Sequence, residues 1–236
     1  MPTQIHLSAD PNGVARDFTC YLLEQLQGKK HFTIALSGGS TPKLLFRLWA
    51  TEYQDAIDWS AIHFFWGDER CVQPDDDESN FGMTKALLFD KVNLPVENIH
   101  RVRGEDEPEK EARRYAAEIA DNTEQSNGFP SFDLVILGMG DDGHTASIFP
   151  HEMELLEEER FCAVATHPTS GQKRVSITGP VINNAQRVAF LVTGANKEEK
   201  VSAIFQRKEG YHAYPAAHVQ PVTGALHWFL DDAAMY

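Results

Sequence analysis

The chain has 236 residues and a formal net charge of -14, from 21 basic and 35 acidic residues. This acidic balance argues against nucleic acid or an anionic membrane as the main partner, because both are themselves negatively charged. Hydrophobic residues make up 42% of the chain, which is enough for the core of one α/β domain over residues 1–236. An anionic small molecule would need a local cluster of Lys, Arg and backbone N–H groups.

The cysteines and the first residues point to a cytoplasmic protein. Cys20, Cys71 and Cys162 are odd in number, widely spaced and without a C-x-x-C pair, so neither a disulfide framework nor a structural zinc site is expected. The opening sequence MPTQIHLSAD lacks the basic and apolar segments of a signal peptide. No window approaches the ~18 apolar residues that a membrane span requires.

In chain order, apolar strands alternate with segments of helical periodicity. A strand at 4–7 precedes a helix at 11–26 capped by Asp10, and a strand at 32–36 precedes a glycine-rich turn and a second helix. A strand at 62–66 leads through a polar loop into a helix at 81–88. Residues 109–124 should form a helix with a solvated charged face.

Three later apolar runs, at 134–137, 173–178 and 188–193, each lead into a turn and a helical segment. This alternation predicts an α/β fold with a doubly wound, mainly parallel sheet, whose ligands bind beyond the carboxyl ends of the strands. The acidic segments 75–78 and 152–160 are expected to be solvated surface.

The strand at 134–137 runs into a glycine-hinged turn that carries Asp141, Asp142 and His144. A buried strand fixes the position of this turn, and its glycines let the backbone approach a ligand. Histidine titrates near neutral pH, so His144 is suited to taking and returning a proton, with Asp142 as the better candidate to orient it. The alternative is a structural or solvated histidine, which is common in turns.

A second strand end, SGGSTPK at 37–43, opens a helix. Its backbone N–H groups and hydroxyls lie at the positive end of the helix dipole and suit a phosphate. The spacing matches neither a Walker A motif nor a dinucleotide fingerprint. The alternative is a tight turn with a capped helix. The candidate ligands are Ser37, Gly38, Gly39, Ser40 and Thr41.

Two further strand ends carry charged groups. The turn TGANK places Lys197 at the start of a helix, where it either clamps a phosphate or is an ordinary solvated lysine. The segment GDER supplies Asp68, Glu69 and Arg70, so that Arg70 binds an oxyanion or phosphate while an acid orients it or the substrate hydroxyls. A surface ion-pair cluster is the competing interpretation.

These segments, in this order, resemble the 6-phosphogluconolactonases over nearly the whole chain. The matching blocks include ALSGGSTPKLLF, FFWGDERCV, FDLVILGMGDDGHTASIFP, KRVSITGPVINNA, VTGANK and PAAHVQPV. These enzymes are similar in fold to the sugar-phosphate isomerases and deaminases, which use a Rossmann-like sheet. The resemblance implies hydrolysis of a phosphorylated sugar lactone in the pentose phosphate pathway, with no cofactor or metal, by a monomer or weak homodimer.

The resemblance also implies roles for individual residues. His144 would be the general base, residues 37–41 and Lys197 would hold the 6-phosphate, and Arg70 would lie beside the substrate with Asp68 and, as a weaker correspondence, Arg174. Charge developing on the carbonyl oxygen would be met by Arg70 or by backbone N–H groups of the glycine turns.

Three alternatives remain. An isomerase or deaminase would use the acidic pair 68–69, but deaminases carry Asn-Glu-Pro where this chain has Ile148-Phe149-Pro150, and an apolar ring cannot relay a proton. A non-catalytic sugar-phosphate sensor would bind the same ligand without turnover. A serine hydrolase is disfavoured because neither Ser37 nor Ser147 lies in a G-x-S-x-G elbow.

Overall fold

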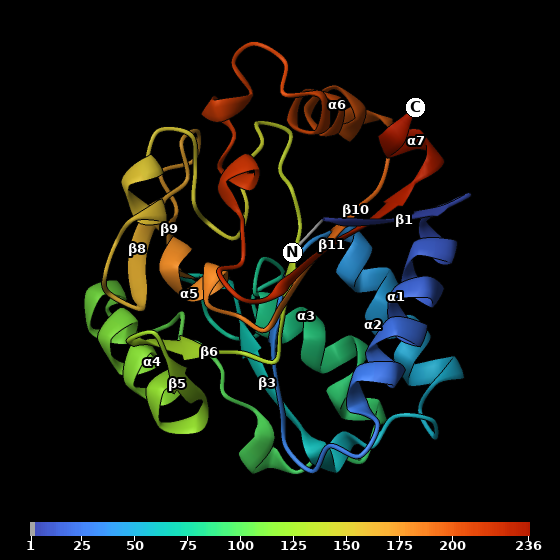
Figure 1. Cartoon of the computed structure of the whole chain (residues 1–236). Coiled ribbons are helices and arrows are strands. Elements are labelled where there is room, and N and C mark those ends of the chain that lie inside the picture. Colours follow the sequence, from blue (N-terminus) through green and yellow to red (C-terminus); the bar gives the residue numbers. More distant parts are fainter. Residues whose placement is uncertain (1–2) are drawn as a thin grey trace.

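The computed structural model describes residues 3–236 and has a six-stranded sheet. Helices pack on both faces of this sheet (Figure 1). The strands of this sheet are β1 (Gln4–Ser8), β2 (Phe32–Leu36), β3 (Ile62–Trp66), β7 (Leu134–Leu137), β10 (Arg187–Val192) and β11 (Ala225–Asp231). All five strand pairings are parallel, in the order β1-β11-β10-β7-β2-β3. The predicted α/β fold with a mainly parallel, doubly wound sheet is confirmed.

Smaller elements complete the fold. The helices are α1 (Pro11–Leu26), α2 (Ser40–Glu52), α3 (Asn80–Leu87), α4 (Pro108–Asn122), α5 (Gly179–Asn183), α6 (Glu198–Gln206) and α7 (Asp232–Met235). A second, antiparallel sheet consists of β4 (Asp68–Arg70), β9 (Lys173–Ile177) and β8 (Cys162–Thr166), and β5 (Glu124–Ser126) pairs with β6 (Phe129–Ser131).

The order of the strands creates a switch point between β2 and β7. From β2 the chain moves outward to β3, whereas from β7 it moves the other way to β10 and β11. The segments that follow β2 and β7 therefore diverge and leave a crevice at the carboxyl edge, where ligands bind in open parallel sheets. These two segments are the SGGST turn and the turn that carries His144.

Each face of the sheet buries its own hydrophobic cluster. Phe18, Phe46 and Trp49 pack α1 and α2 against one face, and the other face packs against α4, the second sheet and α6. The expected N-cap of α1 is confirmed, since the Asp10 carboxylate accepts a hydrogen bond from Gly13 N at 2.9 Å. Such caps each contribute about 1 kcal/mol to helix stability.

The apolar run at residues 173–178 was expected in the parallel sheet, and that expectation is wrong. Residues 167–172 alone join β8 to β9, and so short a link permits only an antiparallel hairpin, since a parallel crossover needs a dozen or more residues. β9 also pairs antiparallel with β4, so the segment expected as a polar strand end is itself a short strand.

The charged face of α4 was expected to be solvated, and this expectation is wrong for Glu111, which is only 1% exposed. Its carboxylate accepts hydrogen bonds from Arg103 N at 2.7 Å and from Arg114 Nη2 at 2.7 Å. The Glu111 carboxylate is therefore hydrogen-bonded to protein groups instead of water.

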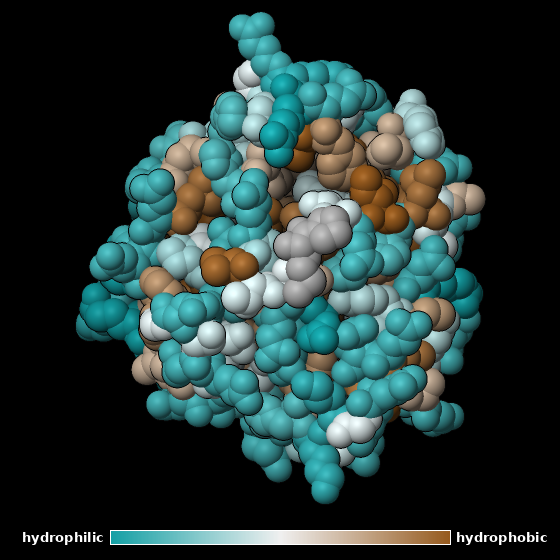
Figure 2. All heavy atoms as spheres, in the orientation of Figure 1, coloured by the Kyte–Doolittle hydropathy of each residue, from teal (hydrophilic) through white to brown (hydrophobic). Residues whose placement is uncertain are grey.

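The surface seen in Figure 2 is mostly hydrophilic, with scattered hydrophobic patches. Within residues 3–236, no helix combines the length and apolar character that crossing a bilayer demands. Cys20, Cys71 and Cys162 are free thiols.

Candidate active site

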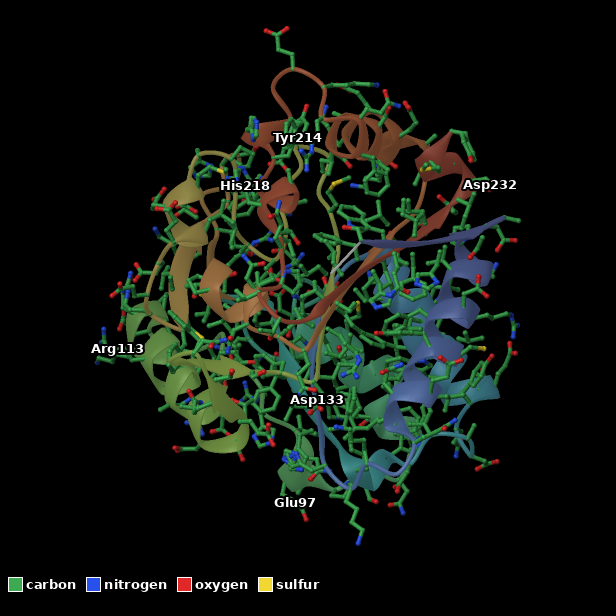
Figure 3. The ribbon with its side chains drawn as sticks, viewed as in Figure 1. Glu97, Arg113, Asp133, Tyr214, His218 and Asp232 are labelled. Atoms are coloured by element: carbon green, nitrogen blue, oxygen red, sulfur yellow. The ribbon has the colours of Figure 1, made fainter. Side chains whose placement is uncertain are left out.

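A cavity of about 210 Å³ occupies the carboxyl edge of the sheet at the switch point. Figure 3 shows Asp133, the residue before β7, on the far side of the molecule from Tyr214. The Tyr214 ring packs against Gly143, in the turn that follows β7 and carries His144. The cavity brings together ten of the eleven predicted site residues, and the eleventh, Asp142, contacts the cavity residue His144. Those ten are Ser37, Gly38, Gly39, Ser40, Thr41, Asp68, Arg70, His144, Arg174 and Lys197.

The glycine turn after β2 forms one wall. Gly39 has φ 105° and is the N-cap of α2, a backbone conformation that favours glycine. The first N–H groups of α2 have no partner within the helix and lie at the positive end of its dipole. A Cβ on Gly38 would lie 1.9 Å from Asn80 Oδ1, so only glycine fits between this turn and α3. These features suit an anion.

His144 is oriented by Asp142. The Asp142 Oδ1 atom lies 2.6 Å from His144 Nδ1 and also accepts a hydrogen bond from His144 N at 3.1 Å. Burial acts to raise the pKa of Asp142, but its hydrogen bonds and charge interaction with His144 lower it to about 2. An ionised carboxylate on Nδ1 stabilises the tautomer with its proton on Nδ1, which leaves Nε2 as a base.

Gly140 lies directly beneath this pair. A Cβ at position 140 would lie 2.1 Å from His144 Nδ1 and 2.9 Å from Asp142 Oδ1, and both distances are shorter than van der Waals contact allows. Replacing Gly140 by Ala should therefore displace the imidazole and lower kcat by at least about 10-fold, since a 1 Å misplacement can cost about 100-fold.

Gly67→Ala is the matched control, because a Cβ there meets only ordinary contacts, the nearest being Leu36 O at 3.5 Å. Steady-state kinetics and thermal melting of both variants provide the comparison. Equal kcat values for G140A and the native chain would contradict this account of the turn.

The two acids that follow β3, Asp68 and Glu69, point to opposite faces of the short strand β4. Side chains alternate between the faces of a strand, and cross-strand partners share a face. Asp68 pairs with Ser176, and Arg70 pairs with Arg174, so these four side chains share the face toward the cavity. Glu69 points to the other face.

Glu69 instead anchors α3. It is 2% exposed, and its carboxylate accepts hydrogen bonds from the backbone N–H groups of Arg70, Asn80 and Phe81 and from the Ser79 hydroxyl. The expectation that this strand end supplies two carboxylates to the site is therefore wrong, because only Asp68 lines the cavity.

We expect Glu69→Gln to lower the free energy of unfolding by about 1–3 kcal/mol, because the amide has one acceptor oxygen where four donors converge. Denaturant unfolding measures this loss. Glu97→Gln, on the surface in Figure 3, is the control and should change stability by less than about 0.5 kcal/mol. A native-like stability for E69Q would show that the carboxylate does not hold α3.

Arg70 and Arg174 form an unusual pair. They are direct cross-strand partners, and the Nε atoms of both are buried with no hydrogen-bond partner among residues 3–236. Burial lowers the pKa of Arg174, Asp68 opposes this effect, and the neighbouring Arg70 adds to it. Two adjacent, partly unpaired guanidinium groups in a cavity form a site for an anion.

Lys197 lies in the cavity, but its ammonium is paired. Its Nζ donates a hydrogen bond to Asp141 Oδ1, which also accepts one from Asn196 Nδ2 at 2.7 Å. The hydrogen bond from Lys197 lowers the pKa of Asp141. Asp141 is thus a partner of Lys197 rather than of the histidine.

Two residues of the site were not predicted from the sequence. Asn80 lines the cavity and donates from Nδ2 to Asp68 O at 2.9 Å, and Thr193 Oγ1 lies 2.9 Å from Thr41 Oγ1. The Ser79-Asn80 pair at the start of a helix was the available signal for Asn80.

Across residues 3–236, no group of three or more His, Cys, Asp or Glu side chains is arranged to hold a metal ion.

The parallel sheet, the anion-binding groups at its switch point and the carboxylate-oriented histidine define an α/β enzyme of small anionic substrates. A family model described as glucosamine-6-phosphate isomerases/6-phosphogluconolactonase matches residues 10–228. The chain belongs to this family.

Individual relatives support the same family membership. The chain is 45% identical over 223 residues to a 6-phosphogluconolactonase of Haemophilus influenzae, with 94% of this chain and 92% of the relative covered. It is 45% identical over 199 residues to one of Treponema pallidum, covering 84% and 83%. Among solved structures, the devB protein superposes with a TM-score of 0.95 at 44% identity, covering 99% of this chain and 98% of that chain.

Proposed function

We propose that this protein is a carboxylic ester hydrolase that converts 6-phospho-D-glucono-1,5-lactone to 6-phosphogluconate in the oxidative pentose phosphate pathway. Relatives that align with 84% and 94% of the chain carry the name 6-phosphogluconolactonase. The observation that carries the chemistry is the Asp142–His144 pair, whose imidazole lines a cavity that also holds Arg70 and Arg174.

In the proposed mechanism, His144 Nε2 takes a proton from water as the water attacks the C1 carbonyl. The same imidazole then returns the proton to the ring oxygen as the C1–O bond breaks, which opens the ring. A positioned base typically contributes about 100- to 10,000-fold to the rate. Asp142 holds the imidazole and stabilises its charged form.

The remaining groups bind and orient the substrate. We place the 6-phosphate at the SGGST turn, where the N-terminus of α2 and Lys197 offer donors, although Lys197 must then share its ammonium with Asp141. Arg70 and Arg174 line the same cavity and can contact either the phosphate or, with backbone N–H groups of the glycine turns, the charge on the carbonyl oxygen. Asp68 and the turn hydroxyls are suited to the sugar hydroxyls.

Phe149 argues against deamination. Its ring is fully buried, with its centroid 4.7 Å from that of His144 and the Arg174 guanidinium 5.6 Å from the ring. An apolar ring in this place cannot relay a proton to the histidine. Ser147 is also fully buried, and its hydroxyl donates to Asp68, so it is no exposed nucleophile.

The deciding experiment generates the lactone in situ and measures its hydrolysis above the spontaneous rate. The proposal predicts acceleration, with no ammonia released from glucosamine 6-phosphate. Ammonia release would favour the deaminase instead, and ligand binding without turnover would favour the sensor.

We further propose a cytoplasmic location and a monomeric or weakly dimeric state. Three free thiols suit a reducing compartment. Sedimentation at several protein concentrations tests the oligomeric state, and a tight dimer would contradict the proposal.

A further inference from the structure

Ser147 lies in the turn after the catalytic histidine, yet its side chain faces the second sheet. It is fully buried, and its hydroxyl donates to Asp68 Oδ2 at 2.6 Å, while Ser147 N donates to Ser176 Oγ at 3.2 Å. The residue before it, Ala146, has φ 47°, in the left-handed region that non-glycine residues rarely adopt. This uncommon backbone conformation indicates that the inward placement of Ser147 serves a purpose.

The Asp68 oxygen that Ser147 binds is also the one nearest to Arg174. Arg174 Nη1 lies 3.7 Å from Asp68 Oδ2, beyond hydrogen-bond distance. A carboxylate and a guanidinium buried side by side normally close to about 2.7–2.9 Å, often with two parallel bonds. Here the Asp68 side chain is 7% exposed and the Arg174 side chain 11%, and yet the two groups form no hydrogen bond.

Arg174 is consequently left without any hydrogen-bond partner among residues 3–236. Its cross-strand neighbours are Arg70 on β4 and Ala165 on β8, and neither side chain can neutralise it. A buried guanidinium without a partner is strongly stabilised by an anion that binds beside it. The Asp68 carboxylate would prevent this binding if it occupied the same position.

We infer that Ser147 is a positioning residue that holds the Asp68 carboxylate off Arg174 and so keeps the guanidinium free for the negative charge of the substrate. The inference rests on the proposed anionic substrate. Without the hydroxyl, Asp68 would turn onto Arg174 and compete with the ligand for it. The lactone chemistry itself is not required for this effect.

Inorganic phosphate is the probe, because its binding needs no turnover and is measured by calorimetry. We expect Ser147→Ala to weaken the phosphate Kd by about 10-fold, the scale of one charge-assisted hydrogen bond. In an Asp68→Asn background, where no carboxylate is present to capture Arg174, the same substitution should change the Kd by less than about 2-fold. Ser131→Ala, which removes a buried hydroxyl bonded to Asn184 O, should leave the Kd unchanged.

Three outcomes overturn the inference. An equal loss from S147A in the native and D68N backgrounds would show that the serine only supports the turn, and native phosphate affinity in S147A would show that it does nothing for Arg174. A native chain that binds no phosphate would likewise refute it. If S147A does not fold, Ser147→Cys, whose thiol is a weak donor, replaces it with the same expected pattern.

Lactone hydrolysis is assayed separately. A chain that shows this dependence of phosphate binding on Ser147 but does not accelerate hydrolysis would refute the proposed function and leave the inference standing.

Discussion

Replacing His144 by Gln is expected to lower kcat for lactone hydrolysis by about 100- to 10,000-fold, with a small change in KM. Glutamine keeps a polar side chain of similar reach, but it cannot accept and return a proton near neutral pH. The effect falls on kcat because the base acts as the water attacks, after the substrate has bound. Initial rates with lactone generated in situ, corrected for spontaneous opening, measure it.

His151→Gln is the matched control for this prediction. Like His144, His151 packs against the Phe149 ring, with ring centroids 5.8 Å apart, and its side chain is 46% exposed. It does not line the cavity. We expect near-native kcat for H151Q, and a native rate for H144Q would assign the base to another group.

Arg174→Met is expected to lower kcat/KM by up to about 100-fold. Methionine fills similar space but supplies no charge or donor, and a hydrogen bond to a charged group contributes about 1.5–3 kcal/mol, where 1.4 kcal/mol is tenfold. Removing a guanidinium beside Arg70 also relieves repulsion, so the variant should remain as stable as the native chain. Kinetics and thermal melting are measured together.

The substrate without its phosphate shows which end of the ligand Arg174 meets. A similar loss against glucono-1,5-lactone would place the guanidinium at the carbonyl, and a loss confined to the phosphorylated lactone would place it at the phosphate. Arg160→Met, on an exposed arginine paired with Glu158, is the control. Unchanged kcat/KM for R174M with both lactones would remove Arg174 from the site.

Much of the site was predictable because parallel strands bring their carboxyl ends to one edge. The turns after β2 and β7 were recognised from glycine, hydroxyl and histidine patterns beside apolar runs, and they do meet at the switch point. Asp142 was expected to orient His144, and a 2.6 Å contact joins them. Local sequence carries this information because each turn is fixed by the strand before it.

The rest depends on pairing between segments far apart in the chain. Nothing in the local sequence showed that residues 68–70 pair with β9, so the opposite roles of Asp68 and Glu69 could not be foreseen. The contact between Lys197 and Asp141 likewise joins two separate turns. Strand β11 was not predicted at all.

The pH dependence of kcat tests the central claim most directly. Asp142, with its pKa lowered to about 2, stays ionised throughout the range above about pH 4, so its own protonation cannot cause a loss of kcat in that range. The account predicts that native kcat falls on the acid side with a slope of one proton, and that the residual activity of H144Q lacks this limb. An acid limb that persists unchanged in H144Q would show that His144 is not the general base.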